Sequence, residues 1–141
     1  MDHVKGTVYI KWIESKYMTG VDSRGNSLVM GRSLDREPPW SGLKPSDLLL
    51  LAAASCSTYD VLMILEKQRE PVEGIEVACI GEQEKEPLYK FVSIHIHYEV
   101  KGQVNPDKVA RAINLSEEKY CSVTNTLKPA LKITSDFVVI D

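Results

Sequence analysis

Alternation of apolar and polar residues is the clearest pattern in this chain, and it is strongest in residues 92–100. Apolar side chains at every second position there alternate with Ser93, His95, His97 and Glu99. A period of two is typical of a strand with one buried face. Residues 75–79 show the same period, with Ile75, Val77 and Cys79 on one face. The two segments predict two long, successive strands.

The first thirty residues also predict strands. Val8, Ile10 and Trp12 alternate with polar or amphipathic residues, which is the period of a half-buried strand. Turn-forming residues at 22–26 (DSRGN) separate two further short strands and would complete an N-terminal meander. Residues 32–45 hold three prolines and a glycine and therefore predict a long loop.

Residues 46–68 predict a long helix with Pro45 in its first turn. The run LLLLAAAS from Leu48 to Ser55 has no polar face. A helix that is apolar on every side is a buried helix, and this one would be about 33 Å long at 1.5 Å per residue. One small sheet cannot cover such a helix, so we expect a partner subunit.

The remaining elements follow from capping signals. Asn105 and Pro106 predict the start of a second helix, and Ser116 predicts the start of a short third one that carries Tyr120 and Cys121. Residues 131–140 predict a final strand. The expected element order is β-β-β-α-β-β-α-α-β, which places the protein in the α+β class as a single domain, 1–141.

Composition and charge exclude several classes of protein. The chain has 141 residues and a net charge of −3, with basic residues scattered along it, so it lacks the basic face of a nucleic-acid-binding module. No secretory signal is visible, and the strongly apolar run Leu48–Tyr59 is shorter than the roughly 20 residues of a membrane span. We expect a cytoplasmic protein without a nucleic-acid or membrane partner.

The three cysteines are too few for a disulfide framework, so each is a buried apolar residue or a reactive thiol. Cys79 lies on the apolar face of its predicted strand and is assigned to the core. Small residues surround Cys56, which fits both a buried structural cysteine and a thiol that another molecule can approach. Cys121 has polar neighbours, which makes simple packing a weaker explanation there.

Other chemistry has little support in the sequence. His95 and His97 share a polar strand face and could join the cysteines around zinc, but no pair has the close CxxC or HxxxH spacing of such sites. We interpret these histidines as solvated or interfacial. No glycine-rich phosphate loop, GxSxG or HExxH motif is present. The remaining candidates for chemistry are the two thiols and the charged residues near them.

Two segments resemble the OsmC/Ohr family, in particular an OsmC-like branch of it. The first is Pro45–Asp60 (PSDLLLLAAASCSTYD), where a proline eleven residues before a cysteine opens an apolar helix. The second is Leu115–Val123 (LSEEKYCSV), which is similar to the segment of the family's second cysteine. The likeness extends over essentially the whole chain, including the order of elements.

The resemblance implies an intertwined homodimer, in which two central helices are embraced by sheets of both subunits. It also implies a thiol peroxidase that reduces organic hydroperoxides to alcohols. Cys56 would attack as the thiolate and become a sulfenic acid, Cys121 would condense with it to a disulfide, and a small dithiol would restore both thiols. The resemblance implies that no metal and no bound organic cofactor is required. The alternative is a non-catalytic OsmC-like stress protein that binds a small ligand.

A reactive Cys56 needs a lowered thiol pKa, because the thiolate is the nucleophile. Asp60 lies one helical turn after Cys56 and would raise that pKa if it points at the sulfur. The family resemblance implies an activating arginine held by an acidic residue near the start of the helix. Asp47 matches the acidic position, and the candidate arginines precede it in the chain: Arg36, Arg32 and Arg24.

Overall fold

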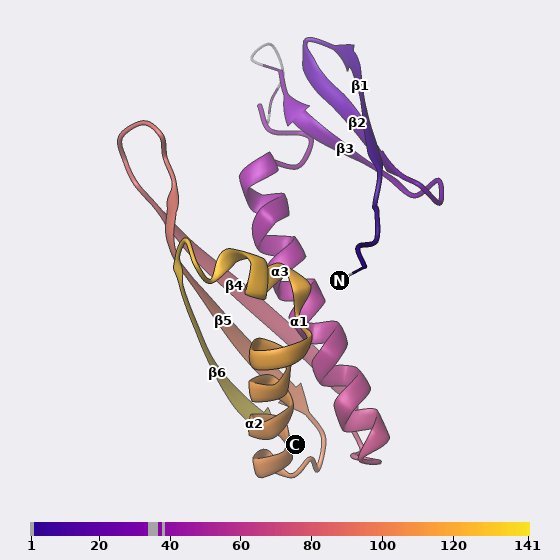
Figure 1. The fold of residues 1–141 in the computed structure, drawn as a ribbon, viewed down its shortest axis with the longest axis vertical. Helices are drawn as coiled ribbons and strands as arrows, with labels where there is room; N and C mark the ends of the chain where they lie inside the picture. Colours follow the sequence, from indigo (N-terminus) through magenta and orange to yellow (C-terminus); the bar gives the residue numbers. More distant parts are fainter. Residues whose placement is uncertain (1, 34–36, 38) are drawn as a thin grey trace. The chain divides into compact units, whose positions relative to one another are not determined.

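The computed structural model describes residues 2–33, 37 and 39–141. The described residues form two compact units, which divide between Leu48 and Leu49 and are drawn in Figure 1. The elements follow the order β-β-β-α-β-β-α-π-α-β. The predicted order and the α+β class are therefore confirmed, with one π-helical segment added between the last two helices.

The N-terminal unit contains an antiparallel sheet in the order β1-β2-β3, made of Val8–Glu14, Lys16–Asp22 and Ser27–Arg32. Asp22 organises the predicted turn, since its Oδ1 accepts from the backbone amides of Arg24 at 2.8 Å and Asn26 at 2.9 Å. A short polar side chain that binds the backbone two residues on is typical turn chemistry. The predicted meander is confirmed.

The side chains on one face of β1 are more exposed than predicted. Val8, Ile10 and Trp12 were expected to be half-buried, but their side chains are 71%, 58% and 69% exposed. Alternation identifies a strand with one apolar face, but it cannot tell whether the same chain covers that face. In this structure β1 presents its apolar side chains to the surroundings.

The C-terminal unit is a two-layer structure of one sheet and the helices on one of its faces (Figure 1). The sheet has the order β4-β5-β6, formed by Gly74–Gln83, Phe91–Lys101 and Lys132–Ile140. β4 runs antiparallel to β5, whereas β6 runs parallel to β5. A parallel pair needs a crossover connection, and the helical segments between residues 106 and 127 provide it.

The core lies between this sheet and its helices. The predicted alternation in β5 is confirmed at four positions, Ile94, Ile96, Tyr98 and Val100, which are completely buried. Val92 at the start of the strand is 46% exposed. Cys79 packs against the core from β4, as predicted. The helices contribute Val61, Leu65, Val109, Ala112 and Ile113.

Helix α1 spans Pro45–Lys67, close to the predicted 46–68, but it is less buried than predicted. Only five of its 23 residues are buried. A stripe at helical spacing is exposed and largely apolar, with Leu51 51%, Tyr59 65%, Leu62 38% and Met63 41% exposed. By length and composition alone α1 could cross a membrane. However, Val61 and Leu65 on its opposite side pack into the core of the C-terminal unit.

Helix α2 spans Pro106–Leu115 and begins as predicted. The Asn105 side chain accepts from the backbone amide of Asp107 at 2.9 Å, and Pro106 occupies the first turn. The next segment differs from the expected short helix. Ser116–Tyr120 forms a π-helix, η1, and a separate helix α3 covers Ser122–Leu127. Cys121 lies between them as the N-cap of α3, rather than inside a helix.

Candidate active site

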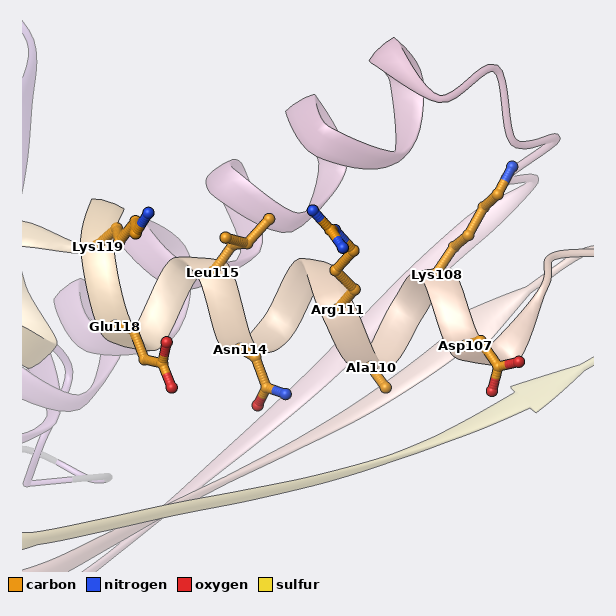
Figure 2. A pocket seen from close by; sticks show the side chains of 8 residues that line it. All are labelled: Asp107, Lys108, Ala110, Arg111, Asn114, Leu115, Glu118 and Lys119. Atoms are coloured by element: carbon orange, nitrogen blue, oxygen red, sulfur yellow. The ribbon is translucent and has the colours of Figure 1, made fainter.

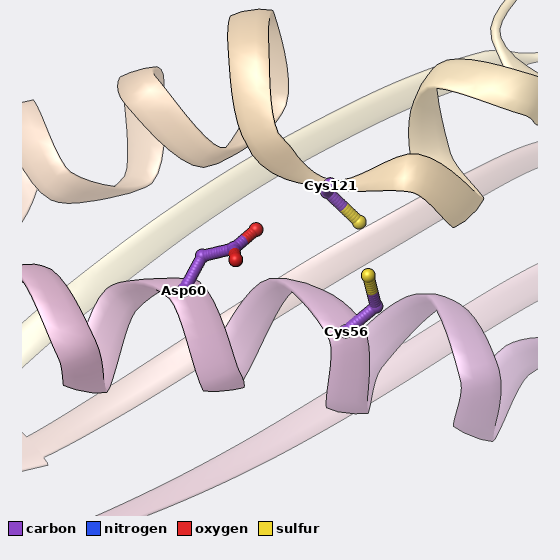
Figure 3. Close-up of side chains that lie close together, drawn as sticks. All are labelled: Cys56, Asp60 and Cys121. Atoms are coloured by element: carbon purple, nitrogen blue, oxygen red, sulfur yellow. The ribbon is translucent and has the colours of Figure 1, made fainter. Parts of the chain in front are cut away.

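The structure brings Cys56 and Cys121 together, although 64 residues separate them in the chain. Their sulfur atoms and a carboxylate oxygen of Asp60 all lie within 4.8 Å of one another. Figure 3 shows the two sulfurs pointing at each other from α1 and from the α3 N-cap, with the Asp60 carboxylate directed to the same space. We call Cys56, Asp60 and Cys121 the thiol–carboxylate cluster.

The π-helical turn places Cys121. The amide of Cys121 donates to the carbonyl oxygen of Ser116 at 2.8 Å, an i to i−5 hydrogen bond. The chain then becomes extended at Cys121, and its Sγ accepts from the amide of Thr124 at 3.4 Å as an N-cap. The side chain is completely buried. Its polar sequence neighbours therefore did not reveal that the thiol faces inward, toward α1.

Hydrogen-bond donors determine the electrostatics at Cys56. Burial raises the pKa of the Cys56 thiol, but the backbone amide of Val123, the thiol of Cys121 and the hydroxyl and amide of Ser122 together outweigh burial and lower it. The Ser122 hydroxyl oxygen lies 3.8 Å from the sulfur. Donors aimed at a sulfur stabilise its anion. The Cys56 thiolate is thus favoured by two backbone amides, one hydroxyl and one thiol.

Cys121 has the opposite tendency. Burial raises the pKa of this thiol, and contacts from Thr124 that favour its thiolate only partly offset burial. A thiolate at Cys56 raises it further. The Cys56 thiol therefore loses its proton more readily than the Cys121 thiol does. Such a difference suits one thiol to nucleophilic attack and the other to a later step.

The first prediction from this geometry concerns the donors at the start of α3. Ser122 is the first residue of that helix and follows an extended residue, so proline fits its backbone. Ser122→Ala removes one donor to Cys56 and Ser122→Pro removes two. We expect the pKa of Cys56 to rise stepwise from wild type to Ser122→Ala to Ser122→Pro, so that alkylation at neutral pH slows several-fold.

The measurement is the rate of iodoacetamide alkylation of Cys56 against pH, followed by peptide mass spectrometry with a metal chelator present. Cys79 serves as an internal reference, because burial alone raises its pKa. Superimposable pH profiles for Cys56 in all three proteins would contradict the assignment of these donors.

A buried chain of hydroxyl groups holds Asp60. Ser116 Oγ donates to Asp60 Oδ2 at 2.9 Å and lies 3.3 Å from Ser57 Oγ. Ser57 in turn is hydrogen-bonded to the hydroxyl of Tyr98. Burial raises the pKa of Tyr98 to about 12, so this hydroxyl keeps its proton at neutral pH. The sequence placed Asp60 near Cys56, but it gave no sign of the hydroxyl groups that fix the carboxylate.

The other predicted site residues are less closely tied to the thiols. Asp47 lies in the first turn of α1, nine residues before Cys56, or about 13 Å along the helix axis. Arg32 ends β3 and lies over the ring of Trp40 at 5.1 Å, within the N-terminal unit. Arg36 lies outside the described residues. A role for these three residues in activating Cys56 stays a prediction.

The histidines do not join the thiols. His95 and His97 lie on the face of β5 opposite the core residues, where Asp136 Oδ1 accepts from both rings at 2.9 and 2.8 Å. All three side chains are partly exposed. The interpretation of these histidines as solvated or interfacial agrees with this position. Cys56 and Cys121 instead lie near the carboxylate of Asp60.

The described surface also has a groove away from the thiols. An open groove of about 660 Å³ follows α2 and η1, and Figure 2 shows its lining side chains along that helical segment. The groove is lined by side chains of both charges, which are Asp107, Lys108, Arg111, Glu118 and Lys119. The mixed charges favour no ligand of one sign, and none of the three cluster residues lines the groove. Chemistry is therefore better supported at the thiols.

The fold and the paired thiols define an α+β protein with a dithiol site between its long helix and the crossover segment. Residues 38–136 match the family described as OsmC-like protein. Protein YhfA of Escherichia coli strain K12 is 38% identical over 133 residues, which cover 93% of this chain and 96% of that protein. The chain therefore belongs to the OsmC-like family, as its two motifs predicted.

Solved structures agree with this assignment. A hypothetical protein from Aquifex aeolicus VF5 is 29% identical with a TM-score of 0.83, over 97% of this chain and 98% of that chain. The organic hydroperoxide resistance protein OhrB of Bacillus subtilis is 12% identical with a TM-score of 0.64, over 96% and 98%. The second likeness shows a shared fold. The predicted OsmC-like fold is confirmed for the single chain.

Proposed function

We propose that this protein reduces organic hydroperoxides to alcohols, with Cys56 as the attacking thiolate and Cys121 as the resolving thiol. One observation carries the proposal: two thiols distant in sequence meet within 4.8 Å. The lowered pKa of Cys56 and the raised pKa of Cys121 support the assignment of roles. The family, which includes proteins of organic hydroperoxide resistance such as OhrB, supports the substrate class.

The reaction has three balanced steps. The Cys56 thiolate attacks the terminal oxygen of the hydroperoxide, the O–O bond breaks, and the departing alkoxide takes up a proton to become the alcohol. Cys56 is then a sulfenic acid. Cys121 attacks its sulfur and expels water, which leaves a Cys56–Cys121 disulfide. A small dithiol reduces that disulfide by exchange and is itself oxidised to a cyclic disulfide.

The oligomeric state belongs to the same proposal. The exposed apolar stripe of α1, defined by Leu51, Tyr59, Leu62 and Met63, is the side of a central helix that a second subunit would cover. We propose a homodimer in which the α1 helices of two chains pack through this stripe. We also propose that the protein works in the cytoplasm, where thiols are kept reduced.

The test of the proposed function uses reduced, metal-free wild-type protein. One equivalent of cumene hydroperoxide is expected to yield one equivalent of cumyl alcohol and a Cys56–Cys121 disulfide, with Cys79 still free. With excess dithiothreitol the turnover should continue. Peptide mass spectrometry and chromatography of the alcohol measure both products. A peroxide-treated protein with both thiols unmodified would favour the alternative, a non-catalytic protein that binds a small ligand.

The Cys121→Ser variant separates the two thiol roles. Cys56 is expected to react once with peroxide and to stop as a sulfenic acid, which dimedone traps, and excess peroxide should drive it on to the sulfinic acid. Steady-state turnover with dithiothreitol should fall, because the internal disulfide cannot form. If Cys121→Ser instead shows wild-type turnover without a dimedone adduct, Cys121 is not the resolving thiol.

A further inference from the structure

The thiol–carboxylate cluster has a second chemical capacity, which follows from its donor atoms. Two sulfurs and one carboxylate oxygen converge on one point, and they come from α1 and from the α3 N-cap (Figure 3). Thiolate and carboxylate are ligands that zinc accepts, and three protein ligands with one open position are typical of zinc sites that bind a further molecule. We propose that the reduced cluster binds one thiophilic divalent cation of the zinc type.

The spacing of the donors fits this ion. Zinc–sulfur bonds of about 2.3 Å and zinc–oxygen bonds of about 2.0 Å place tetrahedral donors roughly 3.5 to 3.8 Å apart. The cluster atoms are separated by at most 4.8 Å. The donors therefore need to approach by at most about 1.3 Å, which rotation of the partly exposed Cys56 side chain can supply in part.

The surroundings orient the ligands as the outer shell of a metal site does. Ser116 donates to Asp60 Oδ2 at 2.9 Å, and a carboxylate has several more lone pairs with which it can coordinate a cation. The amide of Thr124 donates to Cys121 Sγ at 3.4 Å. These contacts fix the acceptor directions of a carboxylate and a sulfur without using all their lone pairs.

The cation and the disulfide exclude each other. Binding displaces the thiol protons and needs both sulfurs reduced, whereas oxidation to the disulfide removes two ligands. A bound cation would therefore shield Cys56 from peroxide and from alkylating reagents, and oxidation would release the cation. This inference uses the same residues as the proposed peroxide chemistry, but it does not require that chemistry to occur.

The experiment titrates the reduced, chelator-dialysed full chain with Zn²⁺ by isothermal calorimetry and with Co²⁺ by absorption spectroscopy. We expect one ion per chain, sulfur-to-cobalt charge-transfer bands and visible bands of a tetrahedral site. Cys56→Ser and Cys121→Ser should abolish the charge-transfer bands, and Asp60→Asn should weaken Zn²⁺ binding at least tenfold. Zn²⁺ should also protect Cys56 from iodoacetamide, and the oxidised protein should not bind.

Matched controls separate this site from others. Cys79→Ala removes a thiol outside the cluster, and His95→Ala removes a ligand from the histidine group on the opposite face of the sheet; both should bind Zn²⁺ as wild type does. No binding by reduced wild type would overturn the proposal. So would equal binding by Asp60→Asn, or loss of binding in His95→Ala alone. None of these results decides whether the protein turns over peroxide, because that activity is measured separately.

Discussion

Replacement of Cys56 by serine is expected to reduce hydroperoxide turnover to the level of protein-free buffer. A serine hydroxyl is not ionised near neutral pH, and its oxygen cannot carry the transferred peroxide oxygen as a sulfenic acid does. Loss of a catalytic nucleophile costs on the order of a thousandfold or more. The measurement is the rate of cumyl alcohol formation with excess dithiothreitol.

Cys79→Ala is the matched control for this substitution. It also removes one thiol, but Cys79 packs against the core from β4 and burial raises its pKa. We expect it to keep wild-type turnover after its folding has been verified by circular dichroism. Equal turnover by Cys56→Ser and wild type would refute the proposed chemistry, whatever the behaviour of the control.

Introduction of a charge into the exposed stripe of α1 is expected to split the proposed dimer. Wild type should have twice the chain mass of 15.8 kDa, whereas Tyr59→Glu should have the mass of one chain. In a twofold-symmetric interface each substitution occurs twice, and an unpaired carboxylate removed from water costs several kcal/mol. Size-exclusion chromatography with light scattering measures the mass directly.

Val138→Glu provides the control for that experiment. Val138 is a 40% exposed apolar residue on β6, on the sheet face away from α1, so the same kind of charge there should leave the mass unchanged. A wild-type mass of one chain at micromolar concentration would contradict the dimer. So would a Tyr59→Glu protein that still has the mass of two chains.

Local patterns in the sequence predicted much of the fold. The alternation in residues 92–100 identified β5, Asn105 and Pro106 identified the start of α2, and the apolar run after Pro45 identified α1. Each of these signals depends on residues close together in the chain. The parallel pairing of β6 with β5 depends on a long-range crossover, and nothing in residues 131–140 distinguishes a parallel from an antiparallel strand.

The sequence predicted the two cysteines of the candidate site, but it did not predict the groups that surround their sulfur atoms. Two cysteine motifs pointed to Cys56 and Cys121, and the structure places these thiols side by side. The groups that favour the Cys56 thiolate include the backbone amides of Ser122 and Val123. Every residue except proline carries such an amide, so composition cannot mark which amides face a sulfur. The path of the chain after η1 determines which amides face the sulfur of Cys56.

That path depends on the π-helical turn at Ser116–Tyr120. A hydrogen bond of a π-helix joins residues five apart, whereas a hydrogen bond of an α-helix joins residues four apart. The π-helical turn therefore acts as a one-residue insertion in the crossover. Each residue of an α-helix advances about 100° around the axis. Shortening this segment by one residue would return it to ordinary helical register and swing the second cysteine away from the first. The spacing of the chain here, as much as the identity of its residues, sets where the two sulfurs meet.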